Sequence, residues 1–127
     1  MVPMPLLSCS SVSASSTWYQ RTLGLTSAHG GDEYEMLLDG DRLVLQLHEL
    51  DADEHPYLVR DDGSFGNGVA VWFESAEYAT AVERMRASGA EILEDDHVNP
   101  LAHHREIWLR DPDGYVVVVS SPFGQVD

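Results

Sequence analysis

Apolar and polar residues alternate on both sides of two short polar turns, which predicts two β-hairpins. Asp39-Gly40, a dipeptide that favours tight turns, separates predicted strands at residues 34–38 and 42–48. The second turn, at residues 111–114, reads Asp-Pro-Asp-Gly and lies inside a hairpin predicted over residues 105–122. Its proline and glycine suit the backbone angles of a turn, and its aspartates can accept hydrogen bonds from nearby backbone N–H groups.

A strand and a helix are predicted before the first hairpin. Residues 4–10 form a short apolar run that favours a strand. Residues 15–23 predict a short helix, because Ser13 or Ser15 can accept a hydrogen bond from a free backbone N–H at its start. Gly24 then takes the left-handed conformation that ends a helix.

The segment before the second hairpin repeats this order. Residues 69–75 predict a strand, and a helix follows that Ser75 caps and Gly89 ends. Its apolar stripe has the spacing i, i+4, i+7 and consists of Tyr78, Val82 and Met85. Residues 90–96 predict a further strand and residues 97–104 a loop.

The two halves therefore predict one α+β domain over residues 1–127, built from a repeated module. Module one covers about 1–50, an acidic linker rich in turn formers about 51–67, and module two about 68–122. One helix covers only one face of a sheet. The other faces must either curl around a shared cleft or pair with another chain.

Net charge limits the classes of binding partner, and cysteine content indicates the cellular compartment. The chain carries 22 acidic and 7 basic residues, a net charge of -15, which argues against nucleic acid and anionic membrane surfaces and would attract a cationic ligand. No apolar run approaches the roughly 20 residues of a membrane span. Cys9 is the single cysteine, so no intrachain disulfide forms and a cytoplasmic location is expected.

Three segments, in this order and spacing, resemble the vicinal oxygen chelate superfamily. They read STWYQRTLGL (residues 16–25), VAVWFES followed by AVERMRASGAEI (from residue 69), and LRDPDGYVVVVSSP (residues 109–122). That superfamily includes glyoxalase I, extradiol dioxygenases, fosfomycin-resistance enzymes and bleomycin-resistance proteins. The resemblance implies two βαβββ modules that form a half-open, barrel-like curved sheet, completed in a homodimer.

The resemblance also implies positions for a divalent metal ion. Enzymes of the superfamily bind it with His or Gln, Glu, His and Glu from the first, fourth, fifth and eighth strands. The corresponding positions here are Met4, Gln46, Gly68 and Val118. Only Gln46 offers a side-chain oxygen, whereas a catalytic metal needs about three protein ligands. We therefore expect no metal ion, no other cofactor and no catalytic residue at these positions.

Strand alternation selects the side chains that should line a cleft. In the fourth strand, Gln46 and His48 project from the face opposite to the one that carries the leucines, and the leucines should pack under the helices. Trp72 shares the face of Gly68, so it should point into the cleft together with Glu74. By the module repeat, the same face of the seventh strand carries Glu106 and Trp108, with Met36 as the counterpart of Trp108. In the eighth strand Val116 and Val118 face the cleft, and Val117 and Val119 face the core.

These side chains describe an apolar slot with acidic groups, which could stack a flat or cationic small molecule. The favoured hypothesis is a metal-independent binding protein of the glyoxalase/bleomycin-resistance type, which could sequester an antibiotic or another planar or cationic ligand. The alternative is a metal-dependent glyoxalase, lyase, thiol transferase or dioxygenase that takes ligands from His48, Glu74, Glu106 or His104. A non-catalytic regulatory module stays open. Loop or surface positions are expected for the other histidines, which are His29, His55, His97, His103 and His104.

Overall fold

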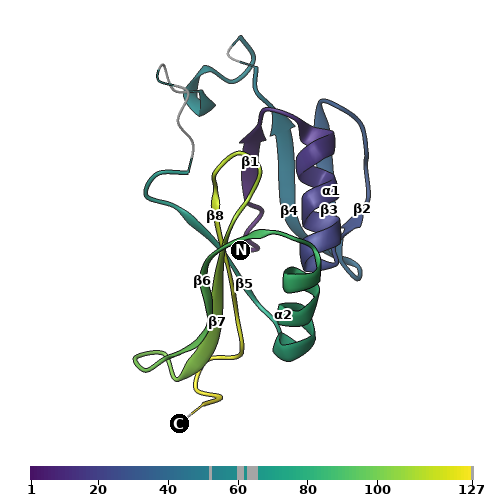
Figure 1. Ribbon diagram of the computed structural model, residues 1–127. Coiled ribbons are helices and arrows are strands. Elements are labelled where there is room, and N and C mark those ends of the chain that lie inside the picture. The colour runs from purple at the N-terminus through teal and green to yellow at the C-terminus, as the bar shows by residue number, and fades with distance from the viewer. Residues whose placement is uncertain (52, 60–61, 63–65, 127) are drawn as a thin grey trace. The chain divides into compact units, whose positions relative to one another are not determined.

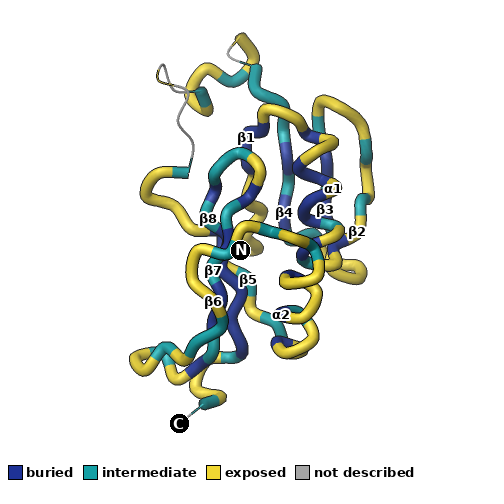
Figure 2. Tube along the Cα trace, in the orientation of Figure 1, coloured by how far each residue is buried: buried dark blue, intermediate teal, exposed yellow. Residues whose placement is uncertain are grey.

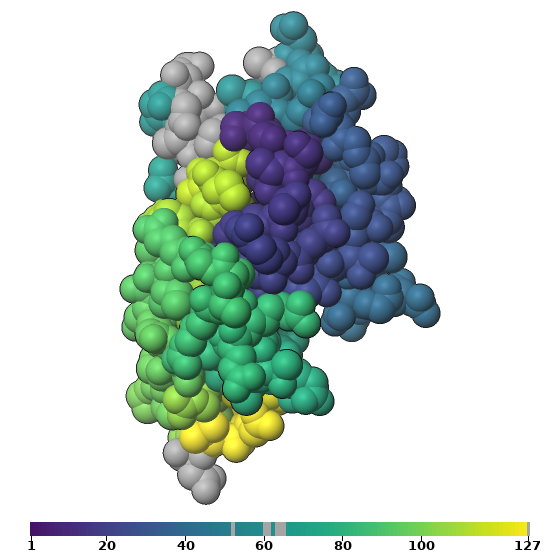
Figure 3. Space-filling model, turned by 45° about the vertical axis from the view of Figure 1, so that its right-hand side comes forward, coloured from purple at the N-terminus to yellow at the C-terminus, as the bar shows by residue number. Residues whose placement is uncertain are grey.

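A computed structural model describes residues 1–51, 53–59, 62 and 66–126 (Figure 1). The chain divides into two compact units, Met1–Phe65 and Gly66–Asp127, which Figure 3 colours from purple to teal and from teal to yellow. Six positions of the predicted acidic linker, residues 52, 60, 61 and 63–65, lie outside the described residues. Each unit is one βαβββ module.

The first unit contains one four-stranded sheet and one α-helix. Its elements are β1 (Leu6–Cys9), α1 (Val12–Leu23), β2 (Thr26–Ser27), β3 (Tyr34–Asp39), β4 (Arg42–Glu49) and a 3-10 turn, η1 (Pro56–Leu58). The strand order is β1-β4-β3-β2. Strand β1 runs parallel to β4, and the other pairs are antiparallel.

The second unit repeats this arrangement. Its elements are β5 (Ala70–Glu74), α2 (Tyr78–Ala87), β6 (Glu91–Asn99), β7 (His104–Arg110) and β8 (Val116–Ser120). The order β5-β8-β7-β6, with β5 parallel to β8, matches the first sheet strand for strand. The predicted internal repeat is therefore confirmed at the level of topology. In the described part of the chain, no helix combines the length and apolar character needed to cross a bilayer.

The starts of both helices differ from prediction. Helix α1 begins three residues earlier, because Ser11, and neither Ser13 nor Ser15, accepts the capping hydrogen bond from Ala14 N–H at 3.2 Å. Gly24 ends it as predicted, with φ of 72°. Helix α2 has Glu77 at its N-cap without a side-chain cap. Ser75 lies two residues before this position, and its hydroxyl accepts from the N–H of Glu77 rather than from the first turn of the helix.

Strand β6 also exceeds its prediction. It continues to Asn99, so the loop predicted over 97–104 is wrong for 97–99 and for His104, which begins β7. The reason is pairing: His97 lies opposite Glu106 and Asn99 opposite His104 in the β6–β7 ladder. Ladder hydrogen bonds therefore override the turn-forming composition of this segment.

Both predicted hairpins are present. In the β7–β8 turn, the Asp111 carboxylate accepts from the N–H groups of Asp113 and Tyr115, each at 2.9 Å. Gly114 takes a positive φ of 93° and donates its N–H to the carbonyl of Asp111. The turn chemistry read from Asp-Pro-Asp-Gly is thus confirmed.

The alternating apolar positions form the core of each unit, shown as dark segments of the central strands in Figure 2. In the first unit Leu45 and Leu47 are fully buried, and Trp18 is buried on α1 as expected. In the second unit Val117 and Val119 are buried on the core face, as the valine run predicted. Arg105 on β7 projects to the same face as these valines. The Asp96 carboxylate accepts hydrogen bonds from Arg105 and from Tyr78 of α2, which shows that α2 covers this face of the sheet.

One acidic side chain lies within the core of the first unit. Glu35 on β3 is only 2 % exposed, and its carboxylate accepts from the hydroxyls of Ser16 on α1 and Ser27 on β2, both at 2.8 Å. A buried carboxylate needs such partners, because it has lost its hydration. Glu35 therefore ties the helix and the edge strand to the sheet.

Candidate binding site

A row of three side chains crosses the second sheet on the face opposite α2. In the strand register Val118 lies directly between Trp72 and Trp108. The two indole rings lean toward each other edge to face, with centroids 5.8 Å apart, although their strands are separated by β8. Val118 is fully buried, whereas Trp72 keeps 44 % of its surface exposed. The row therefore presents an aromatic surface above a buried aliphatic floor.

The edge of the Trp72 indole is held by hydrogen bonding. Its Nε1–H donates to the Ser120 hydroxyl at 2.9 Å. The centroid of the His104 ring lies 5.9 Å from the centroid of the Trp72 indole. An indole with a satisfied N–H and an exposed face is a preorganised stacking surface, since little side-chain freedom remains to be lost on binding.

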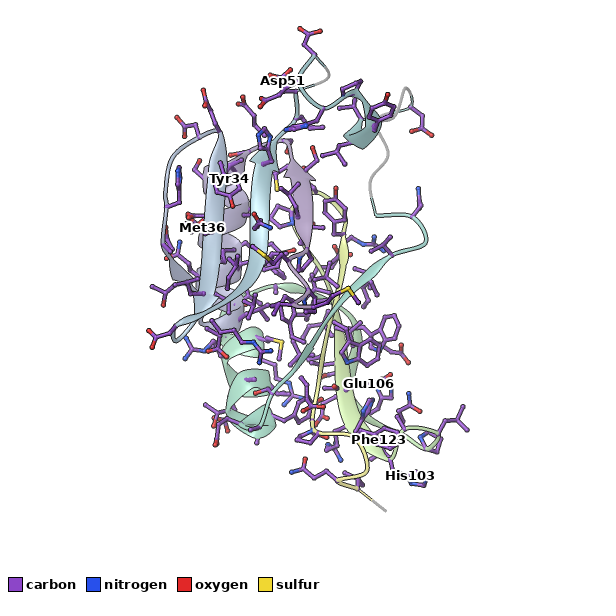
Figure 4. All side chains as sticks on the ribbon, turned by 180° about the vertical axis from the view of Figure 1, so that it is seen from behind. Tyr34, Met36, Asp51, His103, Glu106 and Phe123 are labelled. Atoms are coloured by element: carbon purple, nitrogen blue, oxygen red, sulfur yellow. The ribbon has the colours of Figure 1, made fainter. Side chains whose placement is uncertain are left out.

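Beside the tryptophans lies a buried carboxylate, Glu106, which is 4 % exposed and labelled in Figure 4. Its Oε1 accepts from Trp108 Nε1–H at 2.9 Å and lies 3.3 Å from His97 Nε2. Its Oε2 accepts from Asn99 Nδ2 at 3.1 Å and lies 2.7 Å from His104 Nε2. Four side chains of its own unit therefore surround this carboxylate.

These contacts set the charge of the cluster. Burial by itself raises the pKa of Glu106, but the hydrogen bonds from Trp108, His104 and Asn99 outweigh it and hold the pKa below its usual value. The pKa of His97 is raised, first because its Nδ1–H donates to the Asp95 carbonyl at 2.7 Å, and then through Glu94 and Glu106. Glu106 is thus an ionised anchor that orients its neighbours.

The corresponding face of the first sheet is more polar. Gln46 lies between Leu6 and Met36 in the register, the place that Val118 holds between the two tryptophans. Tyr34, labelled with Met36 on β3 in Figure 4, donates its hydroxyl to Gln46 Oε1. His48 follows on the same face of β4 and is partly buried.

The positions implied for a family metal do not fit a metal ion. The amide of Gln46 is engaged at both ends, because its Nε2 also donates to the Met4 carbonyl at 3.1 Å. Met4 precedes β1, and its side chain is exposed, while Gly68 precedes β5 and has no side chain to offer. Val118 is apolar and buried. A Lewis-acid site cannot be assembled from these groups.

The sequence-predicted side chains thus fall into two groups, each described within its own unit. Gln46, His48 and Met36 share the open face of the first sheet. The open face of the second sheet carries Trp72, Glu74, Glu106, Trp108, Val116 and Val118, and Val116 lies two residues before Val118 on β8, between Ala70 and Arg110 in the register. Sequence reasoning missed His97, Asn99 and Ser120, and it considered His104 only as a metal ligand of the alternative enzyme. For His104 the signal existed, since it alternates with Glu106 and Trp108.

Comparison with known proteins identifies the fold. Residues 3–119 match the model of the Glyoxalase/Bleomycin resistance protein/Dioxygenase superfamily. A search of curated proteins gave no match.

Solved structures share the fold over nearly the whole chain. A glyoxalase/bleomycin resistance protein/dioxygenase from Nocardioides superposes with a TM-score of 0.75 at 21% identity, covering 98% of this chain and 85% of that one. A glyoxalase-related enzyme from Fulvimarina pelagi gives 0.75 at 16% identity, covering 96% and 88%. A family enzyme from Burkholderia phytofirmans PsJN gives 0.74 at 17% identity, covering 93% and 95%. The predicted α+β fold of paired βαβββ modules is confirmed; the homodimer stays a prediction.

Proposed function

The chain belongs to the Glyoxalase/Bleomycin resistance protein/Dioxygenase superfamily, and from this premise we propose that it binds a planar, cationic small molecule on the tryptophan row of its second unit. In this proposal the ligand is held without chemical change and without a metal ion at the positions that family enzymes use. The ligand class includes cationic antibiotics with flat aromatic groups.

The observation that carries the proposal is the exposed Trp72 side chain, whose indole N–H is bonded to Ser120 and whose ring packs against Trp108 in a T-shaped pair. A tryptophan face attracts cations and flat aromatic systems, and a cation–π contact contributes about 0.5–1 kcal/mol when exposed and about 2 kcal/mol or more once desolvated.

Charge favours a cationic ligand. The net charge of -15 draws cations toward the protein, and Glu74 lies exposed two residues beyond Trp72 on the same face of β5. Glu106, by contrast, already faces four partners, so we assign it to positioning Trp108 and His104 and give the contact with ligand charge to Glu74. The same engagement argues against Glu106 and His104 as open metal ligands of a family enzyme.

Calorimetric titration of metal-stripped protein tests the proposal. Metal-free bleomycin and N-methylquinolinium are the cationic probes, and quinoline, which is neutral at pH 8, is the matched uncharged one. We expect both cations to bind, quinoline to bind more weakly, and Trp72→Leu to lower the affinity for the cations about tenfold. Tyr57→Leu, which removes an exposed aromatic ring from the first unit, should leave affinity unchanged.

Three results would overturn the proposal. The first is equal affinity of Trp72→Leu and the parent protein for every probe that binds, because the site would then lie elsewhere. The second is restoration of binding only after a divalent ion is added back, since the ligand would then depend on a metal. Chromatography of the probes after incubation gives the remaining check, because any product would make the protein an enzyme.

A further inference from the structure

Three potential metal ligands converge just beyond the end of β4 in the first unit. They are His48, the next-to-last residue of the strand, and Glu54 and His55 from the segment that follows it. Their ligand atoms all lie within 4.8 Å of one another. None of the three occupies a position where the family resemblance implies a ligand.

The three groups are gathered without being bonded to each other. His48 Nε2 lies 3.9 Å from Glu54 Oε2, and His55 Nε2 lies 3.7 Å from Glu54 Oε1. Both separations are too long for a hydrogen bond. The two imidazole rings meet edge to face with centroids 4.6 Å apart. The carboxylate therefore has one imidazole nitrogen near each oxygen, and a gap remains between them.

The orientation of His48 suits metal binding. Its Nδ1 lies 2.9 Å from the backbone carbonyl of Glu49, and a carbonyl can only accept, so Nδ1 carries the proton. In the neutral ring the lone pair is then on Nε2, the atom that points toward Glu54. Metal-binding histidines are typically held in this way, with the second ring nitrogen donating to a carbonyl or carboxylate.

The segment that supplies the other two ligands is shaped by Asp51, labelled in Figure 4 beyond the end of β4. The Asp51 carboxylate accepts from the N–H groups of Asp53 at 2.9 Å and Glu54 at 3.1 Å. Its backbone carbonyl accepts from His55 N–H at 2.7 Å. This turn carries Glu54 and His55 back toward His48.

We propose that His48, Glu54 and His55 form a binding site for a divalent transition-metal ion of the zinc class. Two imidazoles and one carboxylate favour zinc, nickel, copper or iron over magnesium and calcium, which prefer oxygen ligands alone. Ligand atoms about 2.1 Å from a tetrahedral ion lie about 3.4 Å apart. The ligand atoms of the three side chains lie within 4.8 Å of one another, so side-chain rotations that shorten each separation by up to about 1.4 Å would bring them to this spacing.

Three protein ligands leave at least one coordination position for water or an external ligand. The Glu54 side chain is 58% exposed, so such a ligand can reach the ion from solvent. The site uses none of the residues of the proposed stacking surface. Its existence therefore does not depend on the proposed function.

Titration of the tag-free full chain with Zn²⁺, followed by calorimetry, tests the site. We expect one ion per chain, with binding weakened at least about tenfold by His48→Ala or by His55→Ala and less by Glu54→Gln. His29→Ala is the matched control, because it removes an exposed imidazole from the same unit, and it should bind Zn²⁺ like the parent. Circular dichroism of each variant verifies folding before titration.

Cobalt supplies a second measurement on the same variants. Co²⁺ bound by two imidazoles and a carboxylate should give visible absorption bands that are lost in His48→Ala and in His55→Ala and retained in His29→Ala. The proposal is wrong if Zn²⁺ does not bind the folded parent, or if His48→Ala and His55→Ala bind it as tightly as the parent does. Weakened zinc binding with unchanged binding of N-methylquinolinium would support this site independently of the stacking surface.

Discussion

Trp108 donates its indole N–H to the carboxylate of Glu106, two residues before it on the same face of β7, at 2.9 Å. Because alternate residues of a strand project to one side, this bond links neighbours that the sequence already places together. It turns the edge of the indole toward Glu106 within the same face. The Glu106 carboxylate thus holds the Trp108 indole in its place in the row.

Replacing Glu106 by glutamine should destabilise the second unit. The amide keeps the shape but cannot accept from all the donors around Glu106, and a buried donor left unsatisfied costs about 1–3 kcal/mol. We expect the free energy of unfolding at pH 7 to fall by about 2 kcal/mol. Urea denaturation, followed by tryptophan fluorescence, measures the change, and the exposed Glu83→Gln on α2 is the control for lost charge.

The pH dependence of this loss has a defined sign. Since the pKa of Glu106 is lowered in the folded protein, its contribution is present above the ordinary carboxyl pKa of about 4.3 and disappears as pH falls through the folded value. The difference between parent and Glu106→Gln should therefore shrink on acidification below about pH 4.3. In the variant, NMR titration should show a lower pKa for His97, which loses one of its acidic neighbours.

Glu35 should stabilise the first unit in the way that Glu106 stabilises the second. Burial raises its pKa, but four hydrogen bonds outweigh burial and keep the pKa lowered. The donors are the N–H of Gly30, the hydroxyls of Ser27 and Ser16, and the N–H of His29.

We expect Glu35→Gln to lower the free energy of unfolding by about 2 kcal/mol at pH 7, because the amide leaves buried donors unpaired. Since the folded pKa is lowered, the loss should diminish below about pH 4.3. Denaturation of Glu33→Gln, an exposed neighbour before β3, provides the comparison. Equal stability of the two variants at pH 7 would contradict the assigned role.

Two glycines that open the second unit should differ in their tolerance of alanine. Both have positive φ, 75° at Gly66 and 80° at Gly68, so alanine at either costs about 1–2 kcal/mol in backbone strain. A Cβ at Gly66 would also lie 3.0 Å from the backbone Cα of Tyr115, whereas at Gly68 it meets nothing within 4 Å. Thermal denaturation should therefore show a lower melting temperature for Gly66→Ala than for Gly68→Ala.

Local pattern was sufficient for most elements of the fold. The two hairpins, Gly24 at the end of α1 and the core leucines follow from turn chemistry and alternation, which depend on neighbouring residues alone. Helix starts were less predictable, because Ser11, Ser13 and Ser15 are all suitable cap residues and composition alone does not distinguish them. The end of β6 was set by its partner β7, which no local pattern contains.

For the candidate sites, the sequence by itself determined which residues share a face: Trp72 with Glu74, Glu106 with Trp108, and Gln46 with His48. Only the tertiary structure decided how they meet. It brought Trp72 and Trp108 together over Val118, surrounded Glu106 with donors from two strands, and turned Glu54 and His55 back to His48. Strand alternation is a property of the local backbone, whereas register, side-chain orientation and loop closure depend on residues far apart in the chain.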